Sequence, residues 1–367
     1  MNAFINSVFL ARQVAPEPNV IIRPIAALFG HVVNFLFNIV YAINPANSLG
    51  FAIILMTIIF STCMLPMMLK SQKSMMKMRD LKPELDKLEA KYSNTKDPEL
   101  LKKKRAEQSA LMAKHDANPI KGCFPMLLTM PLFMGVNFIM NQAFLYITRL
   151  RDVYHELAVA IQQVPGYVEM LTPTALDLLP NRLHRNADEV RSLMAQGVSF
   201  EAARAQVGDV ISLEVPADLA RVINRFTAET WYYLQNQIPE YYWSAIAVLN
   251  EQRQAMETFF GLNMVEPGGW TWPVVLIPIL VGLTMAFSMY VGGLRNADQK
   301  ADDKVRMQQR IMTVGMPIFI AFITVGLPMG VGLFWITRQV YQLVQDLVIN
   351  KKAGVPFKLP FVKSKAS

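Results

Sequence analysis

Five apolar segments, each close to the length needed to cross a membrane, constrain this chain more than any other feature. A helix needs about 20 apolar residues to cross a hydrocarbon core of about 30 Å. The segments cover residues 50–69, 122–147, 271–293, 309–326 and 328–349. Hydrophobic residues make up 53% of the whole chain and charged residues only 17%. We therefore expect an all-α polytopic membrane protein with five spans.

The N-terminal segment, residues 1–49, precedes the first expected span and lacks a clear signal peptide, because its apolar run is short and follows no basic region. Residues 24–44 within it are apolar, but His31, Asn34 and Asn38 recur at helical spacing and form one polar stripe. Such a stripe is typical of an amphipathic helix that lies in the membrane interface. A sixth span is the alternative.

Residues 70–121 are polar and basic, with fourteen Lys and Arg against eight Asp and Glu, a net charge of +6. The stretch SNTKDPEL interrupts them, and Asp97 is placed there to cap a second helix that has Pro98 in its first turn. Larger side chains recur at heptad-like spacing before the break, at Leu81, Leu85, Leu88 and Tyr92. We expect a helical hairpin here rather than a solvated loop.

A second polar block, residues 148–270, carries the opposite charge, with nine Arg against fifteen Asp and Glu, a net charge of −6. The turn signals LTPT, LLPNR and EVPADL divide it into several expected helices. Its stretch WYYLQNQIPEYYW, residues 231–243, is rich in aromatic residues. We interpret these as core residues or membrane-interface anchors rather than as a ligand site.

The distribution of basic residues predicts the topology, because Lys and Arg concentrate in cytoplasmic loops. The hairpin at 70–121, the loop at 294–308 and the tail at 350–367 are basic and should lie inside. The acidic block at 148–270 should form an external helical insertion. Five spans with the N-terminus outside and the C-terminus in the cytoplasm satisfy this pattern.

Patterns for enzyme chemistry are missing from the sequence. The four histidines are scattered, and the two cysteines, Cys63 and Cys123, lie in apolar segments without metal-ligand spacing. Neither a Gly-rich phosphate loop nor a nucleophile elbow nor a paired-carboxylate signature is present. We expect no catalytic residue, no cofactor, no metal and no direct nucleic-acid specificity.

Arg338 lies in the middle of the last expected span, where a charge costs at least ~2.5–3.5 kcal/mol. Snorkelling to the interface would have to bridge about 15 Å, beyond the reach of an Arg side chain. Asp346 is two helical turns away, too far for easy pairing within one helix. An intramembrane Arg is tolerable when it faces a water-filled cavity, so we predict such a cavity here.

Several motifs resemble those of the YidC-type membrane protein insertases, the YidC/Oxa-like family. The stretch SLGFAIILMTIIFSTCMLPMMLKSQKSMMKMRDLKPELDKLEAKY resembles the family's first core span and hairpin, and NPIKGCFPMLLTMPLFMGVNFIM is similar to its second core span. PILVGLTMAFSMYV resembles the third, and QQRIMTVGMPIFIAFITVGLPMGVGLFWI the closing helical pair. The resemblance covers residues 50–147 and 272–349, in the family's order.

This resemblance implies a function: family members insert nascent membrane proteins and help them fold, without consuming nucleotide. It also implies five core helices around a polar groove, open to the cytoplasm and to lipid, in the bacterial cell membrane. Expected partners are nascent membrane proteins and membrane lipids, with a ribosome and a Sec-type translocon left open. An assembly scaffold acting through residues 148–270 and, less favoured, a transporter with Arg338 as an anion site are the alternatives.

The sequence departs from the family pattern at Ser61, where the family places an Arg in the first core span. Ser61 and Arg338 lie at similar distances into spans that should run in the same direction. We therefore expect that the groove's positive charge has moved from the first span to the fifth. Further expected groove residues are polar or aromatic, namely Thr57, Asn137, Asn141, Gln142, Ser288 and Trp335. Of these, Ser288 and Trp335 match positions where the family often has a groove-lining residue.

Overall fold

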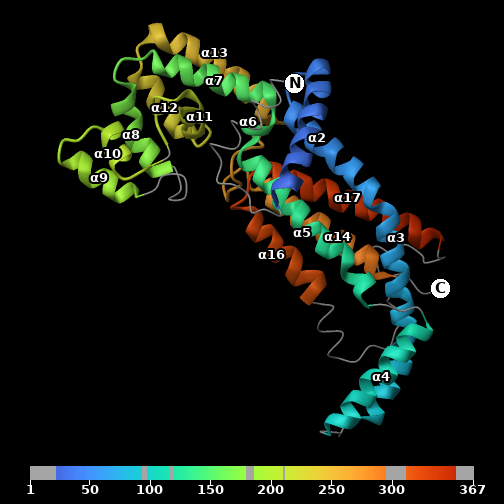
Figure 1. The fold of residues 1–367 in the computed structure, drawn as a ribbon. Coiled ribbons are helices and arrows are strands. Elements are labelled where there is room, and N and C mark those ends of the chain that lie inside the picture. The colour runs from blue at the N-terminus through green and yellow to red at the C-terminus, as the bar shows by residue number, and fades with distance from the viewer. Residues whose placement is uncertain are drawn as a thin grey trace. The chain divides into compact units, whose positions relative to one another are not determined.

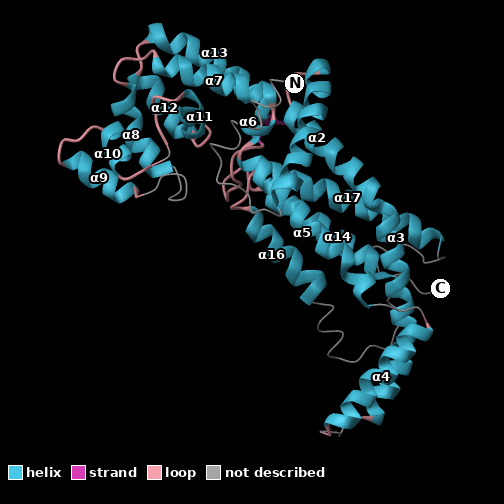
Figure 2. Cartoon of the chain, viewed as in Figure 1, coloured by secondary structure: helices cyan, strands magenta, loops and turns pink. Residues whose placement is uncertain are grey.

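The computed structural model describes residues 22–92, 97–115, 119–178, 186–209, 211–294 and 311–352. It is helical almost throughout, as expected for an all-α protein (Figure 1, Figure 2). The chain forms two compact units, residues 58–134 and residues 1–57 with 135–367. Most of the loop expected at 294–308 and of the tail expected at 350–367 lies outside the described residues, as do residues 1–21 of the N-terminal segment.

The 58–134 unit contains the expected helical hairpin. Helix α3 (Ser48–Lys91) begins in the other unit as the first expected span and continues without a break into the first arm of the hairpin. Helix α4 (Pro98–Lys114) forms the second arm. The Asp97 side chain accepts a hydrogen bond from the backbone N–H of Glu99, and Pro98 stands in the first turn. The predicted helix cap is therefore confirmed.

Polar contacts tie the two arms of the hairpin together at their connected ends. Glu107 on α4 accepts hydrogen bonds from Lys91 Nζ at 3.0 Å and from the Tyr92 hydroxyl at 2.9 Å. Lys104 forms a second ion pair with Glu89 at 3.5 Å. Tyr92, one of the residues at heptad-like spacing, is buried. These contacts stabilise the hairpin although most of its surface is charged.

Several apolar helices fall on the segments expected to span the membrane. Among the described residues, three helices contain windows long and apolar enough to cross a membrane, Ala26–Ile43, Ser48–Met78 and Leu276–Gly293, and a shorter apolar helix covers Thr313–Thr324. Residues 325–328 join the last two helices, which agrees with the tight helical pair expected there. The helices other than α3 that fall on expected spans are α5 (Pro119–Asn141), α14 (Leu276–Gly293), the π-helical turn η2 (Ile311–Gly315), α16 (Met316–Thr324) and α17 (Met329–Lys352).

Helices α14 and α17 pack closely and run in the same direction. Gly332 faces Ile277 near the start of both helices, and fourteen residues further along α17, Asp346 faces Gly292. The Asn350 side chain then donates a hydrogen bond to the carbonyl of Val291 at 3.0 Å. Glycine at position 332 is required by this contact, because a Cβ there would lie 2.3 Å from Ile277 Cγ2.

We expect Gly332→Ala to destabilise the protein by about 1–3 kcal/mol, because the added methyl group overpacks the contact with Ile277. Gly293→Ala is the matched control, since nothing lies within 4 Å of a Cβ placed at the end of α14. Thermal unfolding of both variants in detergent micelles measures the difference. Equal unfolding temperatures for the two variants would show that α14 and α17 leave room for a methyl group at position 332, which contradicts the close packing of these helices.

Helix α2 (Ile22–Ile43) covers the segment for which an interfacial helix or a sixth span was considered. Its polar stripe contacts protein: Asn34 accepts a hydrogen bond from the backbone N–H of Thr148, and Asn38 accepts one from Arg149 Nε. Its exposed side is mostly apolar, with Leu28, Phe35 and Ile39 at the surface, and it also carries the exposed His31. A lipid-covered position in the interface and a membrane span both suit such a surface.

Residues 143–263 include most of the block that is expected to form an external insertion, 148–270, and their described part folds as short helices with a β-hairpin. The strands β1 (Thr258–Phe259) and β2 (Leu262–Asn263) pair antiparallel. Helices α7 and α13 are its longest helices and pack against each other (Figure 1). The helices are α6 (Ala143–Tyr146), α7 (Thr148–Gln162), α8 (Tyr167–Leu178), α9 (Ala187–Ala195), α10 (Phe200–Gln206), α11 (Pro216–Ile223), α12 (Ala228–Gln237) and α13 (Glu240–Glu257).

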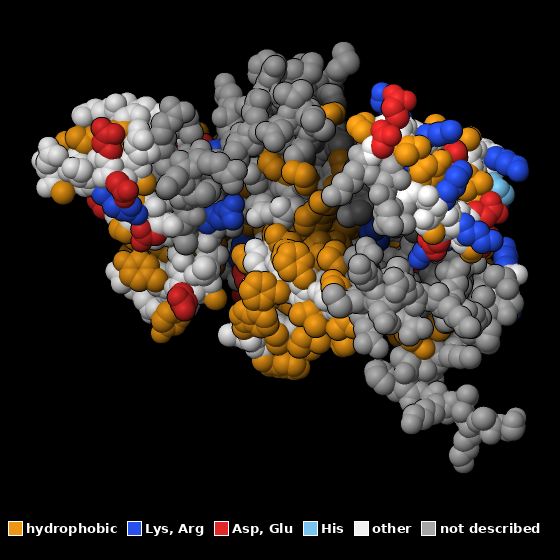
Figure 3. All heavy atoms as spheres, turned by 90° about the horizontal axis from the view of Figure 1, so that it is seen from below, with side chains coloured by type: hydrophobic (Ala, Val, Ile, Leu, Met, Phe, Trp, Pro, Cys, Tyr) orange, Lys and Arg blue, Asp and Glu red, His pale blue; other side chains and the backbone are white. Residues whose placement is uncertain are grey.

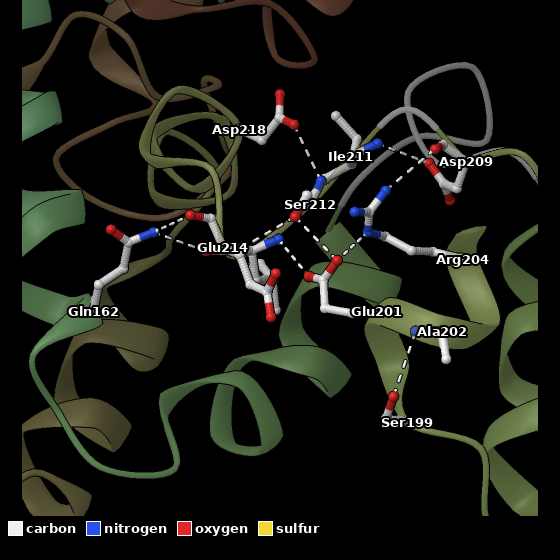
Figure 4. A network of polar contacts seen from close by, with 11 residues as sticks. Gln162, Ser199, Glu201, Ala202, Arg204, Asp209, Ile211, Ser212, Glu214 and Asp218 are labelled. Carbon is white, nitrogen blue, oxygen red and sulfur yellow. Dashed lines mark hydrogen bonds and ion pairs between the residues drawn. The ribbon is translucent and has the colours of Figure 1, made fainter.

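A polar network holds the irregular segment before α11 in place (Figure 4). The Glu201 carboxylate accepts hydrogen bonds from the Ser212 hydroxyl and the Leu213 backbone N–H, and it also pairs with Arg204. Asp218 accepts a hydrogen bond from the backbone N–H of Ser212 at 3.1 Å. Burial raises the pKa of Asp218 above its ordinary value. The carboxylates therefore satisfy backbone groups that no regular helix or strand could pair.

One of the three turn signals in this block was wrong. LTPT does not end a helix, because α8 continues through Pro173 to Leu178. Burial of Leu171 and Ala175 on the same helix outweighs the backbone hydrogen bond that Pro173 cannot donate. EVPADL does start a helix, with Pro216 in the first turn of α11, and LLPNR lies outside the described residues except for its first leucine.

Candidate functional site

Arg338 lies in the middle of α17, and its side chain is partly buried. A row of valines on the same helix marks the exposed side, with Val340, Val344 and Val348 45%, 56% and 50% exposed. Val340 follows Arg338 by two residues, which corresponds to about 200° of rotation around a helix. Arg338 therefore points away from the valine side, which is the side that lipid would cover.

Polar side chains continue from Arg338 along the same side of α17. Gln342, one turn further, donates a hydrogen bond to Asp346 at 3.0 Å, and Asn350 follows one turn beyond. Asp346 and Asn350 are buried where α17 meets α14. From the sequence, Asp346 was considered only as a partner for Arg338, and this row was not predicted. The row could have been predicted because polar residues recur at every fourth position from Arg338 to Asn350, which places their side chains on one side of a helix.

Ser288 and Trp335, which were selected by the resemblance, lie on the two helices that pack together. Ser288 is buried on α14, one turn before Gly292. Trp335 is partly buried on α17, one turn before Arg338. Both residues therefore belong to the helix pair that carries the polar row.

Thr57 and Ser61 lie one turn apart on α3, and both are buried. The Thr57 hydroxyl donates to the carbonyl of Ile53 at 2.6 Å, within its own helix. Ser61 Oγ is buried and has no hydrogen-bond partner among the described residues. Ser61 belongs to the 58–134 unit, so its predicted position level with Arg338 stays a prediction.

Asn137, Asn141 and Gln142 lie at the end of α5. Asn141 donates to the carbonyl of Asn137 at 2.8 Å, and its own carbonyl accepts a hydrogen bond from Asn224 at 3.1 Å. Gln142 precedes α6, and its buried Oε1 has no partner in the described part of the chain. Asn141 thus joins the end of the second span to the external insertion, a position that packing between elements explains by itself.

A cavity of about 450 Å3 lies in the 148–270 block, near the start of α14 and α17. Trp231, Tyr232 and Trp243 line it together with polar side chains, and so do Pro273, just before α14, and Met329, the first residue of α17. Trp231 Nε1 is buried and has no hydrogen-bond partner among the residues that the structure describes. Trp231 and Trp243 of the 231–243 stretch are therefore buried and border this cavity, whereas Tyr233 and Tyr241 are exposed.

A buried ion pair borders the same cavity. Arg253 Nη1 contacts Glu257 Oε2 at 2.5 Å, and the Tyr154 hydroxyl donates to Glu257 Oε1 at 2.7 Å. Burial, together with the adjacent Glu257 carboxylate, raises the pKa of Tyr154 well above its ordinary value. Tyr154 lies on α7 and Glu257 on α13, so their hydrogen bond joins the two helices.

Among the described residues, no group of three or more His, Cys, Asp or Glu side chains is arranged to hold a metal ion. The apolar helices and the polar row on α17 instead define a class of protein, an all-helical protein that crosses the membrane several times. The family model described as "60Kd inner membrane protein" matches residues 40–194 and 232–355. The chain belongs to this family, and the resemblance to the YidC/Oxa-like proteins is confirmed.

Curated relatives from bacteria carry names that agree with this family. A membrane protein insertase YidC 1 of Bacillus cereus is 32% identical over 151 residues, which cover 39% of this chain and 58% of the relative. The membrane protein insertase MisCA of Bacillus subtilis is 43% identical over 89 residues, 24% of this chain and 34% of the relative. A membrane protein insertase YidC of Enterococcus faecalis is 36% identical over 106 residues, 29% of this chain and 38% of the relative. The matched part is thus less than two thirds of the length of each relative. Together with the apolar helices, the family indicates a multi-pass protein of the bacterial cell membrane.

Proposed function

We propose that this protein is a membrane protein insertase that transfers hydrophobic segments of nascent proteins into the bilayer and helps them fold. The family and the names of the relatives support this activity. One observation carries the proposed mechanism: Arg338 lies at mid-helix, on the side of α17 opposite the exposed valines. A charge in that position is expected to face protein and water rather than lipid.

The start of α3 lies beside the start of α17. A Cβ at Gly330 would lie 3.1 Å from Ile53 and 2.7 Å from Met140, so the first turn of α17 lies beside both α3 and the end of α5. Ser61 belongs to the 58–134 unit, so its expected depth relative to Arg338 depends on sequence spacing alone. From that spacing we propose that the charge missing at Ser61 is supplied from α17.

The transfer requires no bond to be made or broken, so we propose neither a catalytic residue nor nucleotide hydrolysis. The short polar flank of an arriving segment would enter the hydrated groove and cross only part of the hydrocarbon. Burial of the segment's apolar surface in lipid, at roughly 25 cal/mol per Å2, would then drive release. The guanidinium would attract acidic residues of the flank before they pass outward.

The proposed topology places the N-terminus and the 148–270 insertion outside and the hairpin, loop and tail in the cytoplasm. Parallel packing of α14 and α17 supports it, because the third and fifth of five spans must cross in the same direction. The contacts of α2 with Thr148 and Arg149, just beyond the end of α5, favour an interfacial position for α2. The basic hairpin is suited to receive a nascent chain near anionic headgroups or to dock a ribosome, and cooperation with a Sec-type translocon is compatible with this arrangement.

An assembly scaffold is the second candidate function, and the cavity in the external insertion favours it. Its volume of about 450 Å3 and its aromatic lining are suited to hold a segment of another protein. In this case the groove beside Arg338 would not contact clients. The two functions therefore predict contacts at different places.

Site-specific photocrosslinking tests the insertase function. A benzoylphenylalanine at Trp335 or Ser61 should crosslink strongly to a stalled single-span client. The same probe at Val344, on the exposed valine side of α17, should crosslink weakly and serves as the control. Crosslinks confined to positions such as Tyr232 at the external cavity would instead contradict the insertase and favour the scaffold.

A further inference from the structure

The β1–β2 hairpin presents an aromatic side chain in an unusual backbone conformation. Phe260 and Gly261 form its two-residue turn, and both have positive φ values, +47° and +83°. Such turns favour Asn, Asp or Gly at both positions, and Phe is rarely found with positive φ. The structure nevertheless leaves the Phe260 side chain 77% exposed. A strained turn that exposes a large apolar side chain is evidence for a role of that side chain outside the protein core.

The tip of the hairpin is continuous with the apolar surface of α3. The ring of Phe260 contacts that of Phe259, with centroids 4.7 Å apart, and Phe259 contacts Phe51 on α3 at 5.2 Å. Phe51 and Leu55 are exposed on the part of α3 that forms the first expected span. The hairpin is also fixed to the start of this helix, because the Phe260 N–H donates to Asn47 Oδ1 at 2.7 Å.

A second aromatic contact joins the segment after the hairpin to α16. Trp270 and Trp272 are 66% and 77% exposed, and the ring of Trp270 lies 6.0 Å from that of Phe322. Phe322 is itself exposed on α16, as are Ile318 and Phe319. Hydrophobic side chains also gather into one large patch in the view of Figure 3. Surfaces of this kind on a membrane-spanning helix are covered by lipid.

The hairpin and the segment after it carry almost no charged residues, as expected for a surface in contact with lipid. Residues 258–265 and 267–294 contain no Asp, Glu, Lys or Arg. The hairpin tip also borders a hollow of about 430 Å3, which is lined by Phe260 itself together with the polar side chains of Asn47, Glu251 and Gln254. Because aromatic and polar side chains meet at the tip, its preferred position is the boundary between headgroups and acyl chains.

We propose that Phe260, Trp270 and Trp272 form a lipid anchor that attaches the external insertion to the surface of the bilayer. The partner is the lipid of the adjacent leaflet, contacted at the depth of the headgroups and the first acyl carbons. Phe260 enters lipid beside α3 and Trp270 enters beside α16, so two separate points hold the insertion against the membrane. This proposal concerns lipid contact alone and holds whether or not the protein inserts clients.

Fluorescence quenching in liposomes tests the anchor. The full chain with Cys63→Ser and Cys123→Ser would receive one nitrobenzoxadiazole label at Phe260→Cys or Trp270→Cys and be reconstituted in phosphatidylethanolamine and phosphatidylglycerol. Tyr241→Cys is the matched control, because Tyr241 is 84% exposed but lies about 25 Å up α13 from the hairpin. The exposed positions keep the core unchanged in all three variants.

The anchor predicts that nitroxide lipids labelled near the headgroup quench the labels at 260 and 270. Iodide in the water should quench these labels roughly fivefold less than the label at 241, because the interface shields them. Equal iodide quenching at 260 and 241 would overturn the proposal. Protection from iodide without quenching by nitroxide lipids would also overturn it, since protein rather than lipid would then cover the tip.

Discussion

Arg338→Ala lowers the insertion of clients with an acidic external tail by roughly tenfold, whereas clients with a neutral tail change by less than about twofold. A carboxylate about 12 Å from the guanidinium gains about 1.4 kcal/mol at an effective dielectric constant of about 20, which corresponds to this factor. Protease protection of the translocated tail in cells measures insertion. Immunoblotting of the variant checks that expression is unchanged.

Two further variants separate charge from packing. Arg338→Lys keeps the charge and should retain most of the insertion of acidic tails. Ser61→Arg combined with Arg338→Ala should restore part of it, since the charge returns to the position where the family carries it. An equal loss for acidic and neutral tails would indicate a structural role for Arg338. Normal insertion of acidic tails by Arg338→Ala would remove the proposed role of the charge.

Arg253→Met destabilises the external insertion by about 3–5 kcal/mol, because it leaves the Glu257 carboxylate buried without its cationic partner. Both side chains are nearly inaccessible, at 5% and 1% exposure. Unfolding in detergent, followed by near-UV circular dichroism, measures the loss. The double change Arg253→Met with Glu257→Leu should recover most of it, since no charge then remains buried.

The exposed pair of Arg191 with Asp188 provides the control for this comparison. Arg191→Met should cost less than about 1 kcal/mol, because solvent screens a pair at the surface. A loss for Arg253→Met as small as that for Arg191→Met would contradict the account of a buried, structurally required pair. A double variant that is no more stable than the single variant would show that packing of the arginine, rather than its charge, matters.

Local and compositional features were predictable from the sequence. The all-helical class and the Asp97 cap depend on local residue patterns, and the structure confirms them. The position of Trp231 and Trp243 in the core was one of the alternatives given for their stretch. In contrast, LTPT misled because burial of neighbouring side chains decided the course of α8, and burial is not visible in a turn motif.

Long-range contacts were not predictable. The Tyr154 hydroxyl donates a hydrogen bond to Glu257, 103 residues away in the sequence, so no local pattern could have predicted this contact. The hairpin turn at Phe260 was missed because Phe is atypical at a positive-φ position. For the candidate site, the sequence pointed to Arg338, but the direction of its side chain followed only from the exposed valines on the same helix. The row through Gln342 and Asp346 was readable from spacing and was overlooked.

The proposed groove requires that water reaches Arg338 from the cytoplasm between the helices. Single cysteines along α17, in the chain with Cys63→Ser and Cys123→Ser, would be treated in oriented vesicles with a membrane-impermeant thiol reagent on the cytoplasmic side. We expect rapid reaction at Trp335 and Gln342, which flank Arg338 by one turn on either side, and little reaction at Val340 and Val344. Equal protection of all four positions would contradict the proposed groove, because Arg338 would then lie in a dry environment.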